Sequence, residues 1–284
     1  MRVLFHLLII SAITSFSYGQ MNPGAKQISM SNSDAALSDD VFALFNNPAG
    51  LAQLNWREVG IYYSPAPFGL NELKNAYIAY VEPLGFGSAG IGAMTYGFEL
   101  YRESKILLSF STSYLHKFFA GVSCNYHLVS IEGYGNKGVI YLNTGCLGYL
   151  TDDLRIGFYV QNLNRASFIS GEDDIPIILD AGLSYNIYYN FSLNFALEKD
   201  IRYKASIMSG INYDIIDNLS LRIGYANEPA KFSCGIGIHY SIFNFDYAVF
   251  THPDLGLTHQ AGIIISFDKE GNRTKNIREY LDIK

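Results

Sequence analysis

The stretch at residues 120–130 reads AGVSCNYHLVS, and apolar side chains alternate along it with small or polar ones. One set comprises Ala120, Val122, Cys124, Tyr126 and Leu128, and the other comprises Gly121, Ser123, Asn125, His127 and Val129. Successive side chains of a strand point to opposite faces, so this period of two predicts a strand with one apolar and one polar face.

The alternation recurs at residues 190–198 (NFSLNFALE), 218–225 (NLSLRIGY) and 243–250 (FNFDYAVF). Marking the chain in this way predicts about fourteen strands. They lie near residues 56–64, 75–82, 86–97, 104–114, 118–130, 138–150, 153–161, 177–186, 190–199, 205–213, 219–226, 231–239, 242–250 and 257–267. Short links such as EPLG and LHK alternate with longer ones such as SPAPFGLNEL. This asymmetry is typical of outer-membrane barrels, which have short periplasmic turns and longer outside loops.

Composition agrees with a membrane barrel. Hydrophobic residues make up 49% of the chain and charged residues only 16%, against roughly 25% charged in soluble domains. Beyond residue 20 there is no apolar run long enough for a membrane helix. A soluble β-sandwich would show the same alternation within strands, but the alternation of short and long links favours the barrel. The net charge of −6 argues against nucleic-acid binding.

Tyrosines gather beside the short links, where an aromatic girdle would meet the membrane interface. They are Tyr114, Tyr149, Tyr185, Tyr189, Tyr213 and Tyr240.

Residues 1–20 have the pattern of a cleaved secretory signal peptide, with Arg2, a short apolar core, and small residues at Ser17 and Gly19. We therefore divide the chain into a signal peptide (1–20), an N-terminal plug (21–54), a barrel (55–267) and a periplasmic tail (268–284). The barrel is expected in the outer membrane of a bacterium. Because the number of strands is even, both chain ends are expected on the periplasmic side.

The segment FNNPAGLAQL at residues 45–54 places turn residues inside an apolar run. The proposed plug residues are Phe45, Asn46, Asn47, Pro48, Ala49 and Gly50. An ordinary periplasmic turn leading into the first strand is the alternative.

Catalytic and metal motifs are not evident. The cysteines Cys124, Cys146 and Cys234 fall on apolar strand faces and are expected to face lipid, although a Cys124–Cys146 bridge stays open. The acids at residues 172–174 fit a solvated loop better than a calcium site. No enzyme activity, cofactor or metal is predicted. Charges on the predicted lumen face suggest an internal salt-bridge network of Arg155, Asp180, Glu198, Arg222 and Asp246.

Residues 24–54 resemble the N-terminal motif of the PorV/PorQ family, within the FadL superfamily of outer-membrane barrels. The stretches at residues 160–185 (VQNLNRASF…IPIILDAGLSY) and 245–267 (FDYAVFTHPDLGLTHQAGIIISF) agree with this resemblance. It implies a 14-stranded antiparallel barrel whose N-terminal segment plugs the lumen.

The resemblance also implies a function: a non-enzymatic component or accessory of type IX protein secretion or surface attachment. Its partners would be outer-membrane lipid and the proteins of a secretion or surface complex. The alternative is a FadL-like channel for uptake of hydrophobic compounds.

The tail at residues 268–284 is charged and lacks alternation, so no fifteenth strand is expected. Ile277, Tyr280, Leu281 and Ile283 could form a weak apolar face on a helix. We expect a tail that is mobile in isolation and orders only against a partner or the barrel rim, or else a disordered end without a role.

Overall fold

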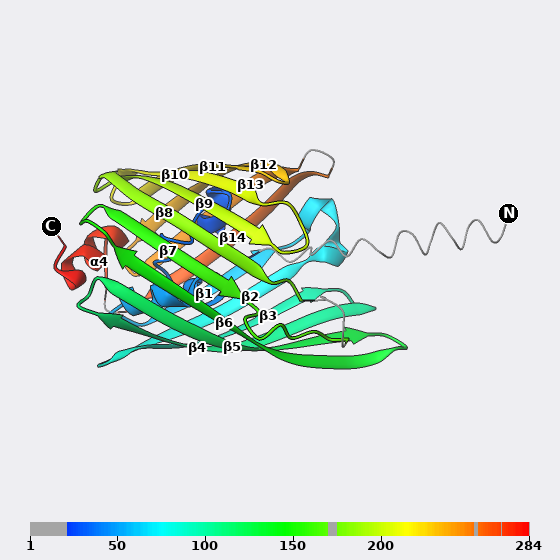
Figure 1. Ribbon diagram of the computed structural model, residues 1–284. Coiled ribbons are helices and arrows are strands. Elements are labelled where there is room, and N and C mark those ends of the chain that lie inside the picture. Colours follow the sequence, from blue (N-terminus) through cyan, green and yellow to red (C-terminus); the bar gives the residue numbers. More distant parts are fainter. Residues whose placement is uncertain (1–21, 170–174, 253–254, 268, 284) are drawn as a thin grey trace.

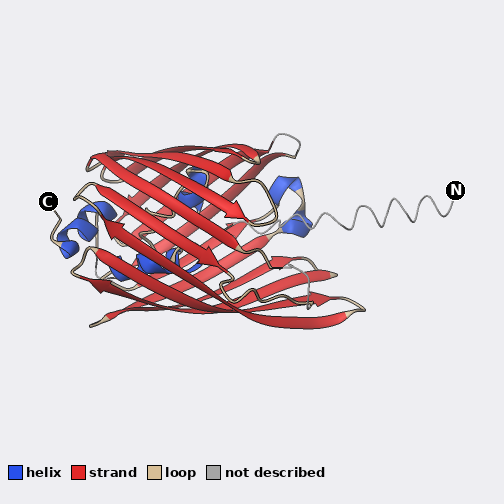
Figure 2. Cartoon of the chain, viewed as in Figure 1, coloured by secondary structure: helices blue, strands red, loops and turns tan. Residues whose placement is uncertain are grey.

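The computed structural model describes residues 22–169, 175–252, 255–267 and 269–283, and it forms one closed antiparallel barrel of fourteen strands (Figures 1 and 2). The strands are β1 Glu58–Ser64, β2 Asn75–Leu84, β3 Gly87–Gly97, β4 Tyr101–Tyr114, β5 Phe118–Ile131, β6 Gly135–Tyr149, β7 Leu154–Gln161, β8 Ile178–Tyr188, β9 Phe191–Asp200, β10 Ser206–Ile216, β11 Leu219–Asn227, β12 Ala230–Tyr240, β13 Phe243–His252 and β14 Gly256–Ser266. Each strand pairs with its neighbours in sequence, and β1 closes on β14. The predicted barrel is thereby confirmed and the sandwich alternative is wrong. The predicted signal peptide and the acids at residues 172–174 lie outside the described residues.

The strand faces follow the period of two. In the pair β5–β6, Asn125 and Tyr141 oppose each other and both are 1% exposed. Their neighbours Tyr126 and Ile140 are 47% and 57% exposed on the outer surface. An apolar outside and a polar inside invert the pattern of a soluble protein and fit a lipid surround.

The expected girdle is partly wrong. Tyr114, Tyr185, Tyr189, Tyr213 and Tyr240 are exposed on the outer face. Tyr149 is only 7% exposed, and its hydroxyl donates to Gln53 Oε1 at 2.8 Å inside the barrel. Tyr149 points inward because it lies an even number of residues from Asn143 on β6, so both side chains are on the inward face.

Residues 22–54, the interior segment, lie inside the barrel, where Figure 1 shows them in blue. Every residue of this segment except Asn22, Lys26 and Asn32 is buried. Its helical turns are α2 Ala25–Ser29, α3 Ala43–Asn46 and η1 Pro48–Gln53. Phe42, Leu44, Phe45 and Leu51 are between 0% and 7% exposed.

Glycines on the inner wall let this segment approach the strands. A Cβ on Gly145 would lie 1.9 Å from Asn47 Oδ1, and one on Gly121 would lie 2.4 Å from the Pro48 carbonyl carbon. Such distances are impossible for real atoms, so any larger residue at these positions would displace the segment.

Two short helices, η2 Pro67–Gly69 and η3 Asn71–Leu73, lie in the β1–β2 loop. The last helix, α4 Arg273–Leu281, lies at the end of the barrel where the strands are joined by short turns (Figure 1). Asn272 caps α4 by accepting from the backbone N–H of Lys275. Ile277, Leu281 and Ile283 are 2%, 4% and 8% exposed. Among the described residues, no helix has both the length and the apolar character to cross a membrane.

The two ends of the described chain lie at opposite ends of the barrel. Asn22 and Pro23 share a cavity with Lys204 and Glu228, which belong to the long-loop end. The C-terminal helix lies at the short-turn end. The interior segment therefore traverses the barrel before β1 begins, and the periplasmic location of the chain ends stays a prediction.

Candidate functional site

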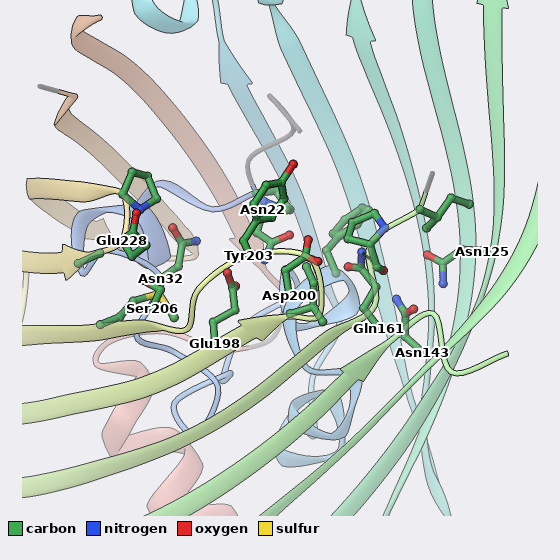
Figure 3. Close-up of a pocket in the computed structure, with 18 of the residues that line it drawn as sticks. Asn22, Asn32, Asn125, Asn143, Gln161, Glu198, Asp200, Tyr203, Ser206 and Glu228 are labelled. Carbon is green, nitrogen blue, oxygen red and sulfur yellow. Dashed lines mark hydrogen bonds between the residues drawn. The ribbon is translucent and has the colours of Figure 1, made fainter. Parts of the chain in front are cut away.

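A cavity of about 710 Å³, here called the vestibule, lies at the long-loop end of the barrel. Its floor is formed by the interior segment, through Pro23, Asn32 and Phe45. Figure 3 shows Asn125 and Asn143 on one side of the vestibule and Asn32 and Glu228 on the other. The volume lies within the range of roughly 300–1,000 Å³ that small-molecule sites occupy.

One side of the vestibule, here called the β4–β6 wall, carries Lys105, Asn125, His127, Tyr141 and Asn143. His127 Nε2 lies 2.8 Å from Glu103 Oε2. The other oxygen of this carboxylate accepts from the Tyr101 hydroxyl at 2.8 Å. The Lys105 ammonium lies 5.8 Å from the centre of the Tyr141 ring and makes no ion pair within the described part of the chain.

The facing side, here called the β9–β12 wall, carries charges of both signs, including Glu198, Asp200 and Lys231. Asp200 pairs with Arg202 at 2.6 Å. Lys231 Nζ donates to Asn32 Oδ1 at 3.3 Å and thereby contacts the floor.

The predicted plug residues hold the floor in place. Phe45 packs edge-on against Tyr77, with ring centres 5.0 Å apart. Asn46 Nδ2 donates to Asp34 Oδ2 at 3.2 Å. Pro48 packs against the wall at Gly121.

Asn47 ties the interior segment to the wall. Its side-chain amide donates to the carbonyls of Ala35 at 2.8 Å and Cys146 at 3.3 Å. Its Oδ1 accepts from the backbone N–H of Ala49, which caps the turn of η1. Gly50 lies against Ser38, where a Cβ would meet the Ser38 carbonyl at 1.9 Å.

The five predicted lumen charges do not form one network. Arg222 and Asp246 pair directly, and Arg222 Nε also donates to Asn212 Oδ1 at 2.7 Å. Asp180 and Glu198 instead face each other across β8 and β9, so two acids adjoin.

Arg155 makes no ion pair at contact distance among the described residues, and the acid that feels its charge is Asp39 of the interior segment. Arg155 donates to Ser184 Oγ at 3.1 Å and lies 5.7 Å from the Tyr149 ring. The network is corrected to one ion pair because register, not strand face, determines which charges meet.

At the short-turn end, the carboxylate of Glu58 joins three parts of the molecule. Glu58 Oε1 accepts from Arg273 Nη1 of α4 at 2.7 Å, Trp56 Nε1 at 2.7 Å and Ser266 Oγ of β14 at 2.8 Å. Glu58 Oε2 accepts from the backbone N–H of Val41 in the interior segment at 3.1 Å.

Arg273 also donates to the Asp39 carbonyl at 3.0 Å. Burial alone would lower the pKa of Arg273, but the carboxylates of Glu58, Asp40 and Asp39 outweigh burial and raise that pKa above its ordinary value. The guanidinium therefore stays charged and holds α4 to the interior segment.

Sequence reasoning missed Lys105, Glu58 and Arg273. Lys105 lies on the same inward face of β4 as Glu103 and Leu107, so the alternation of side chains could have identified it as a charge in the lumen. No local signal pairs Glu58 with Arg273, because that contact depends on closure of the barrel. Within the described ranges, no group of three or more metal-binding side chains occurs.

No protein-family model and no curated protein matches this sequence. Solved structures do resemble it. They include the monoaromatic hydrocarbon channel CymD (TM-score 0.64, 14% identity, 87% of this chain and 98% of that one) and a FadL homologue from Pseudomonas aeruginosa (0.57, 12%, 87% and 97%). A third is the toluene transporter TodX from P. putida (0.54, 13%, 80% and 92%). The chain therefore has the fold of FadL-type barrels, and the narrower resemblance to PorV and PorQ stays a prediction.

Proposed function

We propose that this protein is a non-enzymatic outer-membrane channel for uptake of small hydrophobic compounds, held closed by the interior segment. The observation that carries the proposal is the vestibule of about 710 Å³, which lies at the long-loop end and has the interior segment as its floor. A compound entering from outside would meet this cavity before reaching the seal. This favours the channel over the secretion role that the PorV/PorQ resemblance implies.

The apolar outer surface supports a location in a membrane, and the FadL-type fold supports the outer membrane. Ile106, Leu108 and Ile140 are 54%, 59% and 57% exposed, and an aqueous surround would make such a belt costly. The names of the similar structures support the substrate class, since CymD is a hydrocarbon channel and TodX a toluene transporter.

The seal rests on packing and on polar ties together. Phe45 and Asn47 connect the floor to β2, β6 and β7. Beneath the floor, Arg273 and Glu58 connect the segment to α4. Passage therefore requires the interior segment to shift, in whole or in part.

Conductance in planar bilayers tests the seal. A variant whose residues 22–50 are replaced by a flexible linker of equal length should conduct small ions, while the wild type should stay closed. A matched control replaces residues 71–73 in the β1–β2 loop, where no residue is buried. If the linker variant conducts no more than this control, the interior segment is not the seal.

Docking of secreted cargo or of a surface complex is a separate prediction. It requires a protein that co-purifies with the barrel from its native membrane. Cross-linking before detergent extraction would detect such a partner, and vesicle uptake of toluene would test the channel independently.

A further inference from the structure

Lys105 is placed to recognise a negative charge. It lies on the inward face of β4, next to Asn125, His127 and Tyr141 in the lining of the vestibule. Glu103, two residues earlier, is 8% exposed and does not line the cavity. Of these two charged residues, Lys105 therefore lines the cavity and Glu103 does not.

The neighbouring acid is already occupied. Glu103 accepts from Tyr101 and contacts His127 Nε2, so both carboxylate oxygens have partners. The Lys105 ammonium makes no ion pair within the described residues, and it lies 5.8 Å from the centre of the Tyr141 ring. A cation in a site shielded from bulk water attracts an anion more strongly than it would at an open surface.

The surroundings of Lys105 are aromatic. Tyr77 and Tyr141 line the same side of the vestibule, and Phe45 contributes the floor next to Tyr77. Flat rings pack favourably against such side chains through offset or edge contacts. The facing β9–β12 wall mixes Lys231 with the acids Glu198 and Asp200, so opposite charges adjoin there. Lys105, on the β4–β6 wall, makes no ion pair among the described residues and is the cation best placed for an anionic group.

We infer that the vestibule selects small aromatic carboxylates, with Lys105 binding the carboxylate and Tyr77 and Tyr141 packing against the ring. This inference rests on the proposed channel function and narrows its substrate class. It also separates this chain from the neutral hydrocarbons named for the similar channels. Lys105 is then a specificity-determining residue.

Calorimetric titration of the purified full chain in detergent tests the inference, with benzoate and its neutral analogue benzamide as probes. Lys105→Gln should weaken benzoate binding about tenfold, a change of about 1.4 kcal/mol. Benzamide binding should change less than about twofold, since it lacks the charge that Lys105 recognises. Lys105→Arg, which keeps the charge, should restore most of the benzoate affinity. Lys137→Gln is the matched control, because Lys137 is exposed and lies outside the vestibule lining.

Three results would overturn the inference. The wild-type protein does not bind benzoate, or the Lys105→Gln variant binds benzoate as tightly as the wild type does. In the third result, Lys105→Gln loses equal affinity for benzoate and benzamide, which would indicate a structural role. The channel proposal would survive each of them if vesicles still took up toluene and the linker variant still conducted. If vesicles take up neither toluene nor benzoate and the linker variant does not conduct, while benzoate binding depends on Lys105, then the site is real and the transport role is wrong.

Discussion

Replacing Arg273 with methionine should destabilise the short-turn end of the molecule. Glu58 is fully buried and the Arg273 side chain is 11% exposed, so the substitution leaves a carboxylate without its counter-charge. Breaking a buried pair in this way typically costs about 3–5 kcal/mol. Glu58 keeps its hydrogen bonds from Trp56, Ser266 and Val41, so we expect a loss near the lower limit, about 3 kcal/mol.

Trp56 provides the assay. It is the single tryptophan of the chain, and its indole N–H donates to Glu58 Oε1 at 2.7 Å. Its fluorescence therefore reports on the surroundings of this carboxylate. Urea unfolding of the barrel in phospholipid vesicles, followed at this single emitter, measures the change in free energy of unfolding.

Lys275→Met is the matched control. Lys275 of α4 pairs with Asp217 of the β10–β11 turn, but the two side chains are 50% and 58% exposed. Such an exposed pair contributes about 0–1 kcal/mol. The difference between the two variants isolates the effect of burial.

A second substitution distinguishes charge from packing. Glu58→Gln combined with Arg273→Met removes both charges, so the loss should be smaller than the sum of the single losses. If Arg273→Met alone costs no more than Lys275→Met, the buried pair does not hold α4 against the interior segment and our reasoning is refuted.

Other predictions follow from burial and exposure. Cys124, Cys146 and Cys234 are free and exposed; reduction should not change gel mobility, and a mass corresponding to a bridge would contradict this. Deleting residues 269–284 should leave the barrel folded and heat-modifiable on gels but easier to unfold, since Ile277 and Leu281 lose their burial; failure to insert would contradict it.

Local chemistry in the sequence was sufficient for the strands and their faces. The alternation at residues 120–130 reappears as β5 with Cys124 and Tyr126 outside and Asn125 inside, because the pleat imposes a period of two on any strand. Tyr149 was assigned to the aromatic girdle against this alternation, and that prediction was wrong. The same rule applied to β4 would have identified Lys105.

Only the tertiary structure decided which side chains meet inside the barrel. Alternation places Arg155, Asp180 and Glu198 on the inner face, but register pairs Asp180 with Glu198 and leaves Arg155 beside Ser184. Glu58 and Arg273 come together because β1 closes on β14 and α4 folds back over the open end. Such contacts join residues far apart in the chain, so no local periodicity encodes them.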